Sequence, residues 1–256
     1  MHLKLIAVAL LAGTSIASAA DLPARTYTKA PIAAPMYNWS GFYAGVHAGY
    51  GWGNNDSLNI NGTTPFPAGA VTSTDVDGVL AGGQVGYNYQ FAPSWLVGVE
   101  ADGSWTNIKG QNSALSTVAA NRFQTTNLEL NWLAMVTGRL GYVAGPALLY
   151  VKGGAAFGGV KGGGVTVNPL TGNSLVSTSA GSETRTGWTV GGGVEWNFAS
   201  NWSTKVEYNY VDFGTDSVSR NVAYFGGATG PATLFRDATT HFHLVKVGLN
   251  YRFGPF

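Results

Sequence analysis

The chain is dominated by segments in which apolar and polar residues alternate with a period of two. Eight such segments follow one another from residue 40 onward, and each has 12 or more residues. Strands of globular proteins have about five or six residues, whereas tilted strands that cross a membrane need ~9–11. Alternation of this length predicts membrane-spanning β-strands. We expect them at 40–52, 78–91, 95–108, 127–143, 147–160, 184–198, 202–213 and 239–253.

The connections between these segments alternate between short and long. Ala92-Pro93-Ser94, Ala144-Gly145-Pro146 and Ala199-Ser200-Asn201 consist of residues that favour tight turns. Outer-membrane barrels have short periplasmic turns and long outer loops. The sequence therefore predicts an all-β fold, an eight-stranded antiparallel up-and-down transmembrane β-barrel with both termini on the turn side. Its four long loops are expected at 53–77, 109–126, 161–183 and 214–238.

The two faces of each segment differ in character. In segment 239–253, Val245 and Leu249 share one face, and Lys246 and Asn250 share the other. A soluble antiparallel sandwich would also alternate, but its polar face would carry more Lys and Glu. In segment 127–143, the residues expected to face lipid are Leu128, Leu130, Trp132, Ala134 and Val136. The aromatic girdles expected at the two interfaces include Trp95, Tyr142, Trp188, Phe198, Tyr251 and Phe253.

The opposite, polar face of the segments would fill the interior of the barrel. An eight-stranded barrel is just wide enough for side chains to fill it, and buried charges must be paired. We therefore interpret this face as an ion-pair network that plugs the lumen; a narrow aqueous pore lined by the same residues, or acid–base catalysis by its carboxylates, are the alternatives. The predicted lumen network comprises His47, Gln84, Glu100, Asp102, Glu129, Arg139, Lys152, Arg185, Glu195, Lys205, Glu207, Lys246 and Arg252.

The first segment, Trp39–Gly53, is rich in both glycine and aromatic residues. Glycine-rich runs can cradle phosphates, but the chain contains no G-x-x-x-x-G-K-S/T motif and no dinucleotide fingerprint. Its glycines share one face with Tyr43 and His47, which indicates the inner side of a narrow barrel, where small residues leave room for large ones.

Composition supports a membrane protein rather than a nucleic-acid-binding one. Only 11% of the 256 residues are charged, against about 25% in an average soluble domain, while 37 residues are glycine. The net charge of +1 provides no basic field for nucleic acid. The chain has no cysteine, so packing and hydrogen bonds must supply its stability.

The N-terminal region is expected to lie outside the barrel. Residues 1–20 combine a basic start, an apolar core and a small-residue cleavage site, which together predict a secretory signal peptide. Residues 21–38 contain Pro23, Pro31 and Pro35 and predict an extended periplasmic leader. The barrel is then expected at 39–256.

The sequence contains no recognisable motif for catalysis or metal binding. His241 and His243 share one strand face but have no third ligand nearby, and they are interpreted as polar residues at the membrane interface. His47 is interpreted as an interior polar residue. There is no H-E-x-x-H or G-x-S-x-G motif and no nucleophile with an activating base. We therefore predict no enzyme activity, no catalytic residue, no metal and no cofactor.

Several stretches resemble one protein family. A-D-L-P-A-R (Ala20–Arg25), the run Tyr37–Gly53 and the end G-L-N-Y-R-F-G-P-F (Gly248–Phe256) are similar to the small outer-membrane β-barrel surface proteins of alphaproteobacteria, often described as outer-membrane immunogenic or porin-family proteins. V-E-Y-N-Y-V-D-F-G (Val206–Gly214) resembles a strand of OmpA-like barrels. The resemblance implies an outer-membrane location and a terminal aromatic signal read by the barrel assembly machinery, carried by Tyr251 with Phe253 or Phe256.

The sequence thus favours a structural role in the outer membrane. We expect a barrel that supports the envelope and displays loops, with outer-membrane lipid, lipopolysaccharide and the barrel assembly machinery as partners and no nucleic acid. A narrow porin for small solutes, and loops that bind a ligand such as haem or a host surface, are the alternatives. Contact with peptidoglycan is left open.

Overall fold

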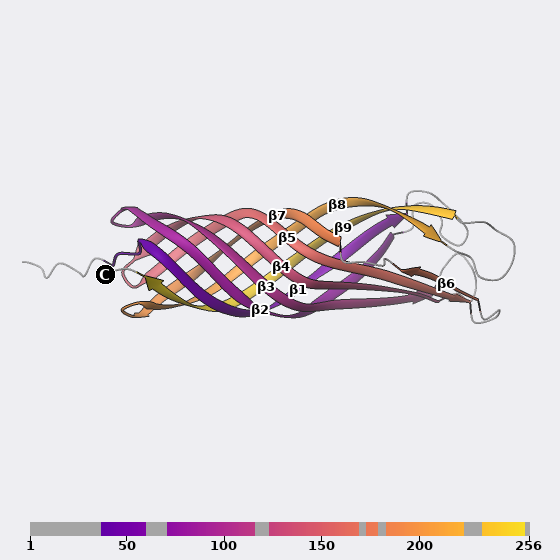
Figure 1. Ribbon diagram of the computed structural model, residues 1–256, viewed down its shortest axis with the longest axis horizontal. Coiled ribbons are helices and arrows are strands. Elements are labelled where there is room, and N and C mark those ends of the chain that lie inside the picture. Colours follow the sequence, from indigo (N-terminus) through magenta and orange to yellow (C-terminus); the bar gives the residue numbers. More distant parts are fainter. Residues whose placement is uncertain are drawn as a thin grey trace, which may run out of the picture. The chain divides into compact units, whose positions relative to one another are not determined.

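The computed structural model describes residues 37–59, 71–115, 123–168, 173–178, 183–222 and 232–253, and these form a closed antiparallel ring of eight long strands (Figure 1). Each strand pairs with the next along the chain, and β1 closes the ring by pairing with β9. The strands are β1 Gly41–Asn59, β2 Val71–Ala92, β3 Trp95–Leu115, β4 Phe123–Ala144, β5 Ala147–Asn168, β7 Glu183–Ala199, β8 Trp202–Val222 and β9 Ala232–Phe253. The predicted eight-stranded barrel is confirmed.

The strands continue further on the loop side than the hydrophobic pattern indicated. β1 ends at Asn59 rather than at residue 52, and β8 ends at Val222 rather than at residue 213. A short additional strand, β6 Asn173–Thr178, pairs with the end of β5 inside the segment expected to be a loop. These extensions are polar, and backbone pairing needs no apolar face, so periodicity in hydrophobicity could not reveal them.

The three predicted tight turns lie at one end of the barrel, where β1 begins and β9 ends (Figure 1). Gly145 has a φ of 61°, a left-handed conformation that favours glycine. Backbone hydrogen bonds link each turn to a neighbouring strand, for example from the Asn197 N–H of β7 to the Pro146 carbonyl at 2.8 Å. The short connections are therefore held against the ends of the strands.

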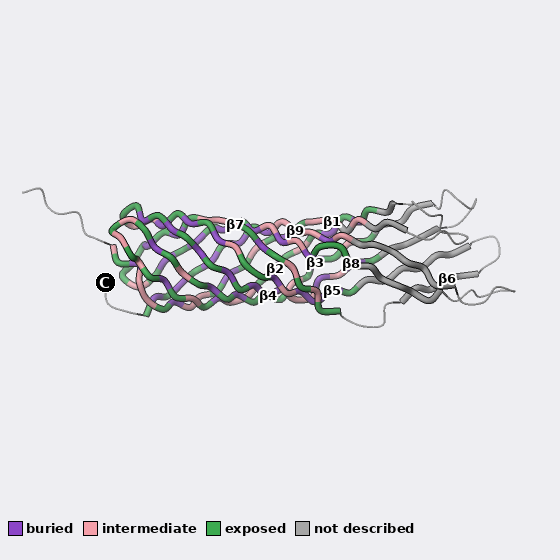
Figure 2. Tube along the Cα trace, turned by 90° about the horizontal axis from the view of Figure 1, so that it is seen from above, coloured by how far each residue is buried: buried purple, intermediate pink, exposed green. Residues whose placement is uncertain are grey.

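Buried and exposed residues alternate along the strands (Figure 2). On β9, Val245, Val247 and Leu249 are exposed, whereas Lys246 and Asn250 are buried, as the alternation predicted. The exposed set is largely apolar and aromatic. The outer face therefore has the character of a surface in contact with lipid.

β4 departs from the expected alternation. Leu128 and Leu130 were expected on the lipid face but are 7% and 1% exposed, inside the barrel. The pairing of β4 with β5 shifts between Leu130 and Trp132, so that Asn131 is an extra residue. Such a β-bulge reverses which face each residue occupies. Ala134 and Val136, beyond the bulge, lie on the outer face as expected.

Because of the same bulge, Glu129 lies on the opposite face from the one predicted. It was expected in the lumen, but it lies between the inward Leu128 and Leu130 and so occupies the outer face. Its partners across the sheet are Lys109 and Lys161, both exposed. The prediction that Glu129 joins the lumen network is therefore wrong.

Some predictions concern residues outside those described. The signal peptide at 1–20, the leader up to residue 36 and Phe256 are among them. Within the described part of the chain, no helix is both long and apolar enough to cross a membrane.

Candidate functional site

The interior of the barrel is filled by side chains in three layers, at increasing distance from the short turns. A small apolar cluster next to the turns contains Trp39, Leu96 and Leu148. A polar and charged layer follows, and a larger apolar cluster lies on the loop side. The lumen is thus divided into chemically distinct zones.

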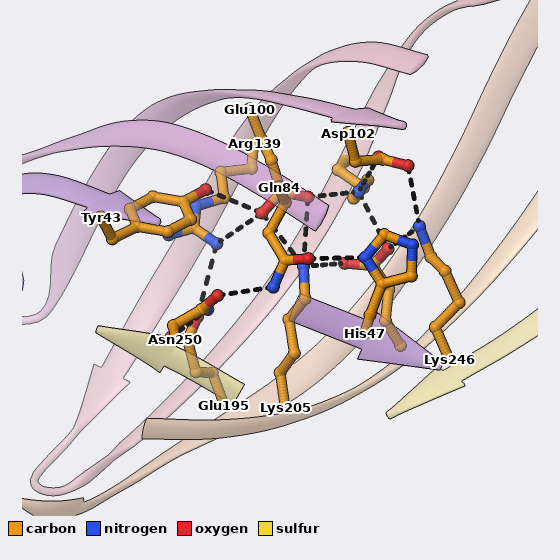
Figure 3. Close-up of polar contacts among 12 residues, drawn as sticks. Tyr43, His47, Gln84, Glu100, Asp102, Arg139, Glu195, Lys205, Lys246 and Asn250 are labelled. Atoms are coloured by element: carbon orange, nitrogen blue, oxygen red, sulfur yellow. Dashed lines mark hydrogen bonds and ion pairs between the residues drawn. The ribbon is translucent and has the colours of Figure 1, made fainter. Parts of the chain in front are cut away.

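The charged layer is centred on Glu100 and Glu207, and Figure 3 shows Glu100 among its polar neighbours. A carboxylate oxygen of Glu100 lies 2.7 Å from Lys152 Nζ, and the other lies 3.1 Å from Lys205 Nζ. Glu207 lies 2.9 Å from Lys152 Nζ and 3.2 Å from Lys246 Nζ. These side chains are at most 1% exposed. Each of the three lysines lies within ion-pair distance of more than one buried carboxylate.

Two further acidic residues extend the network. Asp102 lies 3.3 Å from Lys246 Nζ and 3.7 Å from Lys152 Nζ. Glu195 lies 3.4 Å from Arg139 Nη1, and that guanidinium also faces Glu100 at 3.8 Å. Buried charges are tolerated only when paired and hydrogen-bonded, and every one of these carboxylates meets a cation. The layer acts electrostatically as one connected, nearly neutral unit.

Neutral side chains supply further hydrogen bonds to two of the carboxylates. The hydroxyl of Tyr43 donates to Glu100 at 2.8 Å, and that of Tyr150 donates to Glu207 at 2.7 Å. The Arg139 guanidinium lies over both tyrosine rings, 4.6 and 5.3 Å from their centroids. The tyrosines therefore bind anion and cation at once, and this fixes Arg139 between them.

His47 lies beside the charged layer with both ring nitrogens in use. Nδ1 lies 2.5 Å from Gln84 Oε1, and Nε2 lies 2.8 Å from Ser104 Oγ. Gln84 in turn donates to Asn250 Oδ1 at 2.6 Å. His47 is thus part of the interior hydrogen-bond network. Among the residues that the structure describes, no group of three or more His, Cys, Asp or Glu side chains is arranged to hold a metal ion.

His241 and His243 belong to a different environment, the outer face of β9. His243 Nδ1 lies 2.7 Å from the hydroxyl of Tyr208, and its ring stacks on Trp52 at 5.7 Å. Tyr210 lies 5.2 Å from the ring of His243. The two histidines are therefore embedded in a cluster of aromatic rings on the outer wall.

The apolar cluster on the loop side was not anticipated from the sequence. Two glycines of β1 and β5 make room for it. A Cβ on Gly51 would lie 2.6 Å from Ile108 Cδ1, and one on Gly158 would lie 2.6 Å from Phe213 Cζ. The cluster comprises Val76, Leu80, Ile108, Leu128, Leu130, Leu133, Met135, Ala156, Val160, Val211, Phe213, Phe242 and Leu244.

At the turn side, Trp39 is fully buried just before β1 begins. The guanidinium of Arg252 lies over its ring, 4.5 Å from the centroid, and donates to the Asn38 carbonyl at 2.9 Å. Arg252, predicted for the lumen, is buried and contacts the turn-side cluster. Tyr251 and Phe253 lie on the outer face there and contact each other at 5.1 Å.

Most of the residues predicted for the lumen lie inside the barrel. Those that are buried are His47, Gln84, Glu100, Asp102, Arg139, Lys152, Glu195, Lys205, Glu207, Lys246 and Arg252. Arg185 is half-buried and donates to Thr240 Oγ1 at 3.1 Å, away from the central layer. The sequence prediction omitted Tyr150, Ser203 and Asn209, uncharged residues that its alternation could have identified.

Comparison with known proteins agrees with this geometry. The family described as outer membrane protein beta-barrel domain matches residues 6–253. The 31 kDa outer-membrane immunogenic protein of Brucella melitensis is 31% identical over 262 aligned residues, covering 97% of this chain and 98% of that protein. The 25 kDa outer-membrane immunogenic protein of Brucella abortus is 26% identical and covers 98% of this chain and 97% of that protein.

Among solved structures, the outer membrane protein OprG from Pseudomonas aeruginosa has a TM-score of 0.45 at 13% sequence identity, covering 84% of this chain and 96% of that chain. The family match and the two relatives both agree with the observed fold, a closed ring of strands with an apolar outer face. The chain belongs to the outer membrane protein β-barrel family, and the protein is located in the outer membrane, as its alternating segments and its resemblance predicted.

Proposed function

We propose that the protein is a structural outer-membrane barrel with a closed lumen, which supports the envelope and displays its four long loops at the cell surface. The observation that carries this proposal is the charged layer between two apolar clusters. An ion moving along the axis would have to leave water and enter the dry loop-side cluster, and desolvation makes that step costly. Hydrophobic constrictions also gate by excluding water.

Planar-bilayer conductance tests the closed lumen. Pure, refolded protein is expected to give no reproducible open-channel steps, while a conducting porin under the same conditions verifies the assay. Reproducible steps from the wild-type protein would favour the alternative, a narrow porin for small solutes, and would overturn the closed barrel.

Surface display is tested by epitope accessibility. A tag inserted between residues 60 and 70 is expected to bind antibody on intact cells. The same tag in the turn at Pro93-Ser94 is expected to bind only after the outer membrane is opened. Equal accessibility of the two tags on intact cells would contradict the orientation. The relatives named outer-membrane immunogenic proteins support a role at the surface.

The loops could alternatively bind haem or a host surface. In that case, deletion of the loops would reduce haem uptake or adhesion to the host.

The export route belongs to the same proposal. Residues 1–20 would be removed as a signal peptide, residues 21–38 would remain as a periplasmic leader, and the barrel assembly machinery would read Tyr251 with Phe253 or Phe256. Outer-membrane lipid surrounds the apolar wall, and lipopolysaccharide is the expected outer-leaflet neighbour. N-terminal sequencing of the mature protein is expected to begin at or next to Asp21; an uncleaved Met1 would contradict this route.

A further inference from the structure

One part of the outer wall carries a row of charges with alternating sign. Asp77, Lys109, Glu129 and Lys161 occupy directly opposed positions on β2, β3, β4 and β5. Asp77 and the two lysines are exposed, and Glu129 is partly exposed. The row has no net charge. Its charges are therefore poorly complementary to a uniformly anionic layer of lipid headgroups. They are complementary to a second alternating row of charges presented in reverse order.

A second copy of this chain presents such a row. Two barrels can stand side by side, related by a two-fold axis that runs between them, parallel to the barrel axes and facing the β3–β4 seam of each. Each copy then presents its row of charges to the partner in reverse strand order. Lys109 of one protomer then lies opposite Glu129 of its partner, and the same contact is repeated on the other side of the axis. An interface of this kind is isologous, because the same patch is self-complementary.

The wall next to these charges has the shape that close approach requires. On the turn side of the row is an open hollow of about 460 Å³, whose small outer-face residues include Gly83, Ala101, Gly103 and Ala134. A Cβ added to Gly103 would meet nothing within 4 Å. Trp105 is 79% exposed on the same strand, more than any other large apolar residue described. A bulky side chain beside a hollow of small residues allows two copies to interlock.

We propose that the outer wall of β3 and β4 is an interface between two copies of this chain, held by reciprocal Lys109–Glu129 ion pairs and by packing of Trp105 against the small-residue hollow. Lys109 and Glu129 also face each other within one barrel. The experiment must therefore separate contacts within a copy from contacts between copies.

Mixing two charge-reversed chains makes this separation. Lys109→Glu alone places acidic side chains opposite each other across the interface, and Glu129→Lys alone places basic ones opposite each other. Each variant by itself is expected to lose about tenfold in dimer affinity, because two like-charge contacts of ~0.7 kcal/mol each amount to about one factor of ten. Differently tagged chains of the two variants, refolded separately and then mixed in lipid vesicles, are expected to form heterodimers with wild-type affinity.

A second variant tests the packing without changing charge. Gly103→Leu places a bulky side chain in the hollow, starting from a Cβ that would meet nothing within 4 Å of its own barrel. It is expected to abolish dimers while leaving heat-modifiable migration intact. Gly153→Leu is the matched control, since Gly153 lies on β5 outside the hollow and an added Cβ makes only an ordinary 3.4 Å contact with the Thr189 carbonyl. Wild-type protein that is monomeric in vesicles, charge variants that fail to pair when mixed, or Gly103→Leu dimers of wild-type affinity would each overturn the proposal.

Discussion

The charged layer and the loop-side apolar cluster fill the same lumen by opposite means. In the charged layer, Glu100 and Glu207 are held by lysines of β5, β8 and β9, and each contact is directional. In the apolar cluster, side chains such as Leu244 and Ile108 pack by non-directional contacts, and glycines on other strands leave the space. The first layer depends on correct pairing and the second on correct volume. The two layers should therefore respond differently to substitution.

The largest effect is expected where a shared cation is removed. Lys152 contacts Glu100, Asp102 and Glu207, so Lys152→Met would leave three buried carboxylates with fewer cations. Removing one partner of a buried ion pair costs about 3–5 kcal/mol of unfolding free energy. Urea unfolding from lipid vesicles measures it. Lys161→Met, on the exposed face of the same strand, is the control; it faces Glu129 across the sheet, and loss of such an exposed pair is expected to change the free energy by about 1 kcal/mol or less. Equal effects would refute the idea of a shared cation.

The apolar cluster is expected to show a smaller loss when a cavity is made. Leu244 is fully buried within it, and Leu244→Ala should lower the unfolding free energy by about 3 kcal/mol through lost contacts and the cavity left behind. Leu249, on the outer face of the same strand, is the matched control. Lipid can fill the space that Leu249→Ala leaves, so a loss of about 1 kcal/mol is expected there. A control variant as damaging as Leu244→Ala would mean that the cluster does not pack as a core.

The contrast between the layers also explains what the sequence could predict. Where the lumen is charged and the outer wall is apolar, as around Lys205 and Val206, alternation separates the faces and places each side chain correctly. Where the lumen is apolar too, both faces look alike and alternation carries no information. The bulge at Asn131 falls in that zone, which is why Leu128, Leu130 and Glu129 were assigned to the wrong faces.

Partners within the lumen could not be predicted in the same way. Tyr43 reaches Glu100 across 57 positions of sequence, and Lys205 reaches the same carboxylate across 105. Period-two alternation says which side chains enter the lumen, but the shear of the barrel decides which of them meet. The structure is needed to show that Tyr150 and Tyr43 clamp Arg139 between them.

A hydrogen bond to a buried charge should contribute less than an ion pair. Tyr43→Phe removes the hydroxyl that donates to Glu100 but keeps the ring under Arg139. Because hydrogen bonds to charged groups contribute about 1.5–3 kcal/mol, the unfolding free energy should fall by about 2 kcal/mol. Tyr142→Phe, on the outer face, is the control and is expected to change little. If the two variants unfold alike, the Tyr43 hydroxyl does not stabilise the charged layer.

The smallest expected effect is the coupling free energy between a substitution in the charged layer and one in the loop-side apolar cluster. Substitutions in separate, non-contacting groups usually add to within about 0.5 kcal/mol, whereas members of one ion-pair network show coupling of about 0.5–3 kcal/mol. Lys152→Met combined with Leu244→Ala should therefore be additive. Lys152→Met combined with Glu100→Gln should be less damaging than the sum, because the second change removes a carboxylate that the first left uncompensated. Strong coupling in the first pair would show that the charged layer and the apolar cluster behave as one packed unit, so that volume and pairing cannot be separated along this lumen.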